Sequence, residues 1–152
     1  MTIVIVCVLA ILVPTAQAQD WQVELINLRL ANQPVSAQQL DPRNRPQLYN
    51  TEVLYVPAIQ DPFSIEFGAP YAPNARMLYY RYQLEGFDRG WVYTDTEYRR
   101  ATYTNLSYGN YVFKVEASYD GKTWTGTRQI MLDVAAPGWL SPWAIALYAL
   151  IF

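Results

Sequence analysis

Four segments in the middle of the chain alternate apolar and polar residues with a period of two. They are residues 63–67, 78–84, 111–117 and 130–134. A period of two puts successive side chains on opposite faces of a β-strand, so each segment predicts a strand with one face on a core. Residues 53–56 predict a further strand, and Ile26, Leu28 and Leu30 favour another within residues 22–30.

Glycine, proline and asparagine mark turns between these segments. The turn signals are Gly68-Ala69-Pro70 with Pro73-Asn74, Glu85-Gly86, Tyr108-Gly109-Asn110 and Asp120-Gly121. The Asp-Gly pair predicts a type I′ hairpin turn, in which both central residues have positive φ. The polar residues 32–50 predict loop or edge structure. About seven short strands, with no helix among them, predict an all-β fold, namely an antiparallel immunoglobulin-like or fibronectin III-like β-sandwich.

A tyrosine corner is predicted where the strand over residues 111–117 begins. Residues 106–111 read LSYGNY, which places a leucine, a glycine and a tyrosine at the start of the alternating run. In sandwiches of this class a tyrosine at such a corner donates a hydrogen bond to backbone a few residues upstream. Tyr111 is the candidate, and its predicted role is structural.

The residue inventory excludes several kinds of chemistry. The chain has 152 residues, no histidine, one cysteine (Cys7) and a formal net charge of −2. Without histidine there is no imidazole base and no histidine metal ligand, and a single cysteine supports neither an internal disulfide nor a thiolate zinc site. The basic residues are spread out, and the one adjacent pair, Arg99-Arg100, is interpreted as a solvated strand edge, which argues against a nucleic-acid partner. The sequence therefore predicts no catalytic residue, no metal and no cofactor. This part of the protein is predicted not to be an enzyme.

Two pairs of neighbouring carboxylates raise the question of a catalytic site. Glu85 and Asp88 flank a turn, and Asp95 and Glu97 lie in a polar loop. A glycosidase needs two carboxyl groups at a fixed separation across a cleft, and nearness within a turn does not provide that. Asp88 is predicted instead to cap its turn through the backbone.

Both ends of the chain carry membrane-related signals. Residues 1–13 are uncharged and apolar, and Ala16-Gln17-Ala18 resembles a cleavage site, so residues 1–18 predict a secretory signal peptide. An uncleaved anchor helix is the alternative. Residues 137–152 carry no charge and place Trp139 and Trp143 ahead of an apolar run, which predicts a juxtamembrane segment and the start of a transmembrane helix in a chain interrupted in mid-helix. The alternative is a terminal helix packed on the domain.

Three spaced motifs carry a family resemblance. They are YYRYQLEGFDRGW (79–91), RRATYTNLSYGNYVFKVEAS (99–118) and DGKTW (120–124). In this order they resemble the three-tyrosine (Y_Y_Y) domain of bacterial membrane sensors, with Tyr82, Tyr103 and Tyr111 as the tyrosines of the name. The resemblance divides the chain into a signal peptide (1–18), a three-tyrosine β-sandwich sensor domain (19–136) and a membrane-associated end (137–152). The family motif, given a structural role, comprises Tyr82, Leu84, Gly86, Trp91, Tyr103, Asn105, Leu106, Gly109, Tyr111, Phe113, Gly121 and Trp124.

The resemblance also implies a function in signalling. Such a domain lies on the periplasmic side of the inner membrane, commonly after a β-propeller, and here it is expected to start directly after the signal peptide. It receives or relays a signal, as a homodimer anchored by the C-terminal helix, to a histidine kinase, diguanylate cyclase or DNA-binding output. A passive structural or carbohydrate-binding module of a membrane-anchored protein is the alternative.

The expected ligand is a small molecule, an oligosaccharide or a periplasmic binding protein. Tyr79, Tyr93 and Tyr119 are the candidates for a ligand or interface surface, because exposed aromatic side chains suit both. Trp91 and Trp124 follow turns and are interpreted as core or family scaffold.

Overall fold

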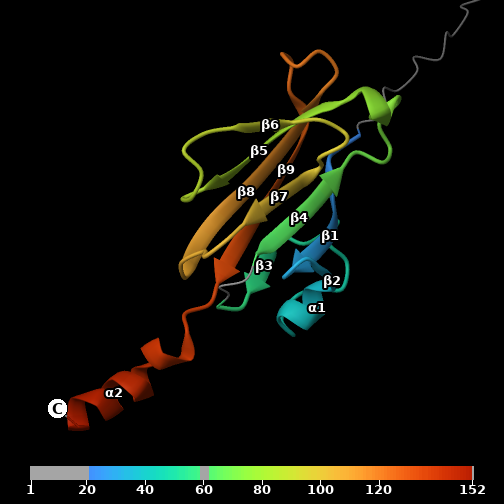
Figure 1. Cartoon of the computed structure of the whole chain (residues 1–152). Helices are drawn as coiled ribbons and strands as arrows, with labels where there is room; N and C mark the ends of the chain where they lie inside the picture. The colour runs from blue at the N-terminus through green and yellow to red at the C-terminus, as the bar shows by residue number, and fades with distance from the viewer. Residues whose placement is uncertain (1–20, 59–61, 152) are drawn as a thin grey trace, which may run out of the picture.

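Two β-sheets pack face to face around a shared core (Figure 1). The computed structural model describes residues 21–58 and 62–151, so the predicted signal peptide lies outside the described residues. Sheet A contains, in spatial order, β2 (Gln33–Val35), β1 (Glu24–Leu30), β4 (Phe63–Gly68) and β7 (Arg100–Tyr103). Sheet B contains β3 (Val53–Val56), β9 (Thr125–Val134), β8 (Gly109–Ser118), β5 (Tyr79–Glu85) and β6 (Val92–Thr94). The predicted all-β sandwich is confirmed.

The core is built from alternate residues of the period-two segments, contributed by both sheets. Its fully buried side chains include Phe63, Ile65, Phe67, Tyr80, Leu84, Phe113, Val115, Ile130 and Leu132. Complete burial of one such apolar side chain stabilises a fold by roughly 1.5–3 kcal/mol before entropy costs. The same alternation that predicted the strands therefore also predicted which face of each strand is buried.

Strand β1 departs from simple alternation because it contains a bulge. Its pairing with β4 shifts register between Leu25 and Asn27. As a result Leu25 and Leu28 are both buried, whereas Ile26 is 45% exposed. The prediction that Ile26 shares a face with Leu28 is wrong, because the extra residue of a bulge re-aims the side chains on one side of it.

One strand pair runs parallel. β3 pairs with β9 in parallel, with Leu54 opposite Leu132, while the other described pairs are antiparallel. The prediction of an antiparallel sandwich is therefore wrong for this pair. A tight hairpin forces its two strands to be antiparallel, but β3 and β9 are far apart in the chain and no turn fixes their relative direction.

The type I′ hairpin turn forms at a different place from the one predicted. Ala31 and Asn32, between β1 and β2, both have positive φ (49° and 62°). At the predicted site only Gly121 has positive φ (68°), and Asp120 does not. The Asp120 carboxylate instead accepts hydrogen bonds from the backbone N–H groups of Lys122 (2.8 Å) and Thr123 (2.7 Å), so it organises a longer loop between β8 and β9.

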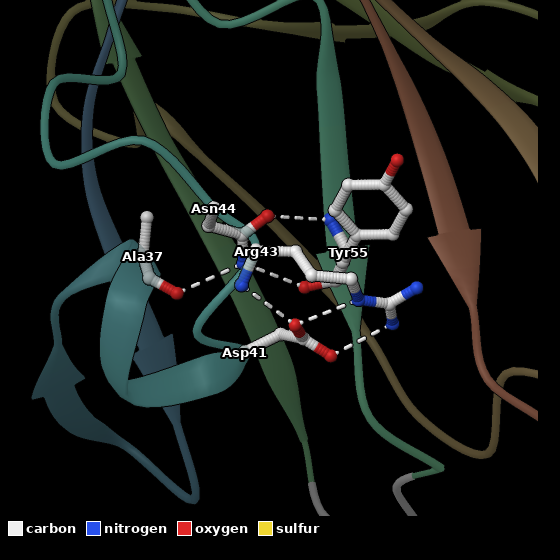
Figure 2. A network of polar contacts seen from close by, with 5 residues as sticks. All are labelled: Ala37, Asp41, Arg43, Asn44 and Tyr55. Carbon is white, nitrogen blue, oxygen red and sulfur yellow. Dashed lines mark hydrogen bonds and ion pairs between the residues drawn. The ribbon is translucent and has the colours of Figure 1, made fainter.

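The polar segment predicted as loop or edge structure is more ordered than expected. It contains β2 and a short helix, α1 (Ala37–Leu40), which Ser36 and Gln39 close with a capping box. Asn44 is 3% exposed, and its side-chain amide donates to the carbonyls of Ala37 and Tyr55 and accepts from the Tyr55 N–H (Figure 2). Asn44 therefore occupies the outer backbone edge of β3, where another chain could otherwise pair.

The same network holds a cation over an aromatic ring. The Asp41 carboxylate accepts hydrogen bonds from the Arg43 side chain (2.9 and 2.8 Å) and backbone (Figure 2), and these bonds lower the pKa of Asp41 to about 2. The Arg43 guanidinium lies 4.0 Å from the centre of the Tyr55 ring. The segment before β3 is thus fixed to the sandwich through polar contacts that no periodicity would reveal.

The chain leaves the sandwich at the end of β9 and forms η2 (Gly138–Leu140) and α2 (Pro142–Ile151). In Figure 1 α2 projects away from the two sheets. Its apolar residues are exposed around the helix, with only Ala144 buried. This exposure does not fit a terminal helix packed on the domain. Among residues 21–58 and 62–151, no helix is both long and apolar enough to cross a bilayer.

Candidate functional site

Two of the name-giving tyrosines, Tyr103 and Tyr111, lie toward the end of the sandwich from which α2 departs, whereas Tyr82 lies in the middle of β5. Tyr103 is 3% exposed, and its hydroxyl donates to the Asp88 carboxylate (3.1 Å). Asp88 also accepts from the backbone N–H of Leu84 (2.7 Å), so it ties the end of β5 to β7, as expected of a residue that caps its turn. Burial, and then the nearby charge of Asp88, raises the pKa of Tyr103. This tyrosine is a hydrogen-bond donor and a scaffold residue.

The predicted tyrosine corner is confirmed. The Tyr111 hydroxyl donates to the carbonyl oxygen of Ser107 (2.9 Å). Its ring lies so close to Gly86, which has a φ of 94°, that a Cβ there would be 3.1 Å from Tyr111 Cδ1. Glycine is therefore required at the β5 turn for two reasons, the backbone conformation and the approach of the ring.

The remaining motif residues also support the fold. Tyr82 is half-buried and packs against Phe67 and Phe113, with ring centres 5.6 and 6.2 Å away, and burial raises its pKa. The other motif residues at this end either fill the core or adopt positive φ, as Leu84, Phe113, Leu106, Asn105 and Gly109 do. The structure thus places them in the scaffold.

The outer face of sheet B carries an aromatic cluster around an arginine. The Arg81 guanidinium lies 4.3 Å from the Trp91 ring centre and 4.5 Å from that of Trp124. It also pairs with the Glu116 carboxylate (2.5 Å), and Tyr93 packs on Trp124 at 5.7 Å. We name Arg81, Trp91, Tyr93 and Trp124 the aromatic platform. Both tryptophans are half-buried on the outer face, so the core alternative for them is wrong, and their role as family scaffold stays a prediction.

The three predicted ligand or interface tyrosines do not form one surface. Tyr93 is 65% exposed and belongs to the aromatic platform. Tyr119 lies at the opposite end of the sandwich from α2, where its ring meets Trp21 edge to face (5.7 Å) and its hydroxyl donates to the Pro73 carbonyl. Tyr79 is exposed near the same end, with its ring close to Gly121. Tyr79 and Tyr119 are therefore candidates for a separate contact surface.

Both pairs of neighbouring carboxylates contain a residue with a structural partner. Glu85 pairs with Lys114, and Asp95 accepts hydrogen bonds from the backbone N–H groups of Glu97 (2.9 Å) and Tyr98 (3.3 Å). Within the described part of the chain, no group of three or more acidic or cysteine side chains is arranged to hold a metal ion.

A hollow lies on the outer face of sheet A, and sequence reasoning missed it. It has a volume of about 700 Å³ and is lined by residues of β1, β4, β7 and the loop that precedes β7. Its lining residues are Ile26, Asn27, Glu66, Phe67, Glu97, Tyr98, Arg99, Arg100 and Thr102. The adjacent basic pair was the available signal: Arg100 does begin an edge strand, but both arginines also line this hollow.

Comparison with known proteins gives a family match for part of the chain. Residues 73–133 match the Y_Y_Y domain, which confirms the resemblance seen in the sequence. Two solved structures of the extracellular domain of BT4673 from B. thetaiotaomicron are similar to the chain, with TM-scores of 0.63 and 0.62 and identities of 27% and 28%. BT4673 is described in one as a proposed one component system and in the other as a proposed hybrid two component system. No curated protein matches the chain.

The likeness extends to a more distant structure but covers a small part of each relative. The extracellular domain of BT3049, a proposed hybrid two component system of the same organism, has a TM-score of 0.55 at 18% identity and supports the fold alone. The three alignments include 77%, 79% and 78% of this chain. Each alignment includes only 16% of the solved extracellular domain.

Proposed function

We propose, taking residues 73–133 as a Y_Y_Y domain, that this chain is the extracytoplasmic sensing and signal-relay part of a membrane receptor. The observation that carries the proposal is the identity of 27–28% to an extracellular receptor domain over more than three quarters of the chain. Neither sheet offers an arrangement that favours catalysis over binding. The proposed localisation is the periplasmic side of the inner membrane.

The route of the relay follows from the connectivity. β9 is hydrogen-bonded to β8 on one side and β3 on the other, and the chain passes from it through η2 into α2. A change in the orientation of the sandwich is therefore transmitted to the apolar helix α2 through the short segment that follows β9. Trp139 and Trp143, both exposed, suit the headgroup region of a bilayer at the start of such a helix. We propose that α2 is the beginning of a membrane anchor and that the receptor acts as a homodimer.

Binding drives such a relay only if the ligand prefers one of two receptor states, because equal affinity for both shifts no population. The proposed output is a histidine kinase, a diguanylate cyclase or a DNA-binding regulator in the cytoplasm. A passive module that only binds carbohydrate is less favoured at the aromatic platform, because Arg81 already stacks on both tryptophan rings.

Two experiments on the gene of this chain test the proposed export and the proposed cytoplasmic output domain. Alkaline phosphatase, which is active only outside the cytoplasm, is fused after Ala136 with residues 1–18 present or deleted. We expect activity only when residues 1–18 are present, and equal activity in both strains would refute export. The reading frame is then followed past Phe152. A cytoplasmic kinase, cyclase or DNA-binding domain is the expected continuation, and a stop codon there in the intact gene would overturn the relay.

A further inference from the structure

We propose that the hollow on the outer face of sheet A binds a ligand that carries one carboxylate and several hydroxyl groups, as a sugar acid does. We name this hollow the sheet A groove, with the lining residues given above. The proposal goes beyond the relay function, because binding is a property of the sandwich that is measured whether or not α2 enters a membrane.

Arg99 supplies the groove with a cation that has no acidic partner. Among the residues that the structure describes, five ion pairs form, and none of them includes Arg99. The side chain lies over the Gly68 backbone: its guanidinium is 2.9 Å from the position that a Cβ on Gly68 would take, and so is Ile26 Cδ1. The backbone is fixed, since the Arg99 carbonyl accepts from the Phe67 N–H (3.1 Å). A positioned, unpaired guanidinium on a groove wall is suited to a carboxylate.

The floor of the groove is a polar cluster centred on Glu66. The Glu66 side chain is 19% exposed and pairs with Arg100 (2.7 Å) and Arg29 (3.6 Å). Asn27 donates a further hydrogen bond to it (3.1 Å). Thr102 adds a hydroxyl that bonds to Ser64 (2.9 Å). These contacts fix the amide, hydroxyl and carboxylate groups at the groove before a ligand binds. Less conformational entropy is therefore lost on binding.

Two apolar surfaces flank the polar floor. Tyr98 is 72% exposed, yet its loop is anchored, because the Tyr98 carbonyl accepts from the Thr94 hydroxyl (2.9 Å) and the Arg100 N–H (2.8 Å). Ile26 is turned outward by the bulge of β1. A flat ring and an aliphatic side chain beside polar groups match the mixed surface of a sugar ring, which has an apolar face and a polar rim.

The balance of charge selects the ligand class. Glu66 and Glu97 line the same groove as Arg99, so a phosphate or another multiply charged anion would meet repulsion that a single carboxylate avoids. The two glutamates accept hydrogen bonds but cannot donate them, and ligand hydroxyls supply the missing donors. A hydroxyl-rich monocarboxylate unit therefore satisfies the groove better than a phosphate or a neutral sugar.

The test measures binding of uronic acids to the full chain. The protein is kept in micelles of an amine oxide detergent, which has no sugar headgroup, and titrated calorimetrically with galacturonate, with a trisaccharide that carries a single galacturonate unit, and with the methyl ester of that trisaccharide. We expect an acidic ligand to bind with a Kd of about 1 mM or below, and the neutral ester to bind at least about tenfold more weakly, the value of one charged hydrogen bond. Binding by galacturonate alone identifies a free sugar acid, and binding only by the trisaccharide identifies an oligosaccharide.

Variants assign the binding to the groove. Arg99→Gln should weaken binding of the acidic ligand by about tenfold or more, and Gly68→Ala should weaken it too, because the new methyl group displaces the Arg99 guanidinium. Arg89→Gln is the matched control: it removes the same charge from the exposed turn after β5 and should leave binding unchanged. Absence of binding by every acid, equal binding of acid and ester, or equal effects of Arg99→Gln and Arg89→Gln would each overturn the proposal. Thermal unfolding of each variant shows that the sandwich is intact.

Discussion

The substitution Arg81→Lys separates the stacking role of the aromatic platform from its charge. The Arg81 guanidinium contacts two tryptophan rings, and each cation–π contact near a surface is worth about 0.5–1 kcal/mol. Lysine keeps the charge but loses the flat group that fits between the rings and the fork that meets Glu116 through two nitrogens. Because the ion pair itself is partly exposed and worth about 1 kcal/mol or less, most of the loss arises from stacking. We expect a total loss of about 1–2 kcal/mol in the free energy of unfolding.

The measurement is urea unfolding of the full chain in micelles, followed by circular dichroism. With an m-value of about 1–3 kcal/mol/M, a loss of about 1–2 kcal/mol should lower the midpoint by roughly 0.3–2 M. Arg100→Lys is the matched control, because Arg100 forms an ion pair with Glu66 and no described ring lies over it. It should change the stability by less than about 0.5 kcal/mol.

A double-mutant cycle with Trp124→Leu isolates the stacking. In that background one of the two ring contacts is already absent, so Arg81→Lys should cost about half as much. If Arg81→Lys costs the same in both backgrounds, or no more than Arg100→Lys, the platform is not held together by cation–π contacts and the reasoning is refuted.

Three further substitutions probe the scaffold. Tyr111→Phe removes the hydrogen bond to Ser107 and should lower the free energy of unfolding by about 1 kcal/mol in urea titrations, with no change if the corner is dispensable. Gly126→Ala should destabilise by about 1 kcal/mol or more, seen as a lower Tm, because φ is 59° and the new Cβ would lie 2.7 Å from Trp21 Cζ3. Backbone hydrogen bonds lower the folded-state pKa of Asp120. Its contribution to the stability of the fold is therefore present above the ordinary carboxyl pKa of 3.8 and is lost as the pH falls. Asp120→Asn should therefore flatten the decline of Tm below about pH 4, and an unchanged pH profile would contradict this.

The period of two was sufficient to predict the strands that form the centre of the sandwich. β4, β5, β8 and β9 lie where alternation placed them, because each buries one face and exposes the other. Tyr111 was predictable for a related reason: the corner geometry depends on residues adjacent in the sequence. Patterns of neighbouring residues thus predict the elements that depend mainly on contacts between neighbouring residues.

The remaining features depend on contacts between distant residues. The bulge beside Ile26 arises from the pairing of β1 with β4, and alternation within β1 alone gives no sign of it. Asn44 is buried in a polar stretch because its partner, Tyr55, lies on β3 eleven residues later. The sheet A groove needs three strands and a loop from separate parts of the chain, so the sequence showed only the pair Arg99-Arg100.

The position of β9 has a mechanical consequence. This ten-residue strand pairs with β8 along most of its length and with β3 over its last four residues, and it ends shortly before η2 and α2. A pull on α2 along the strand axis loads these ladders in shear, so that many hydrogen bonds resist together, whereas a pull across the strands would unzip them singly. We therefore expect sheet B to respond as one unit to a force on α2, with bending in the short stretch between Val134 and Pro142.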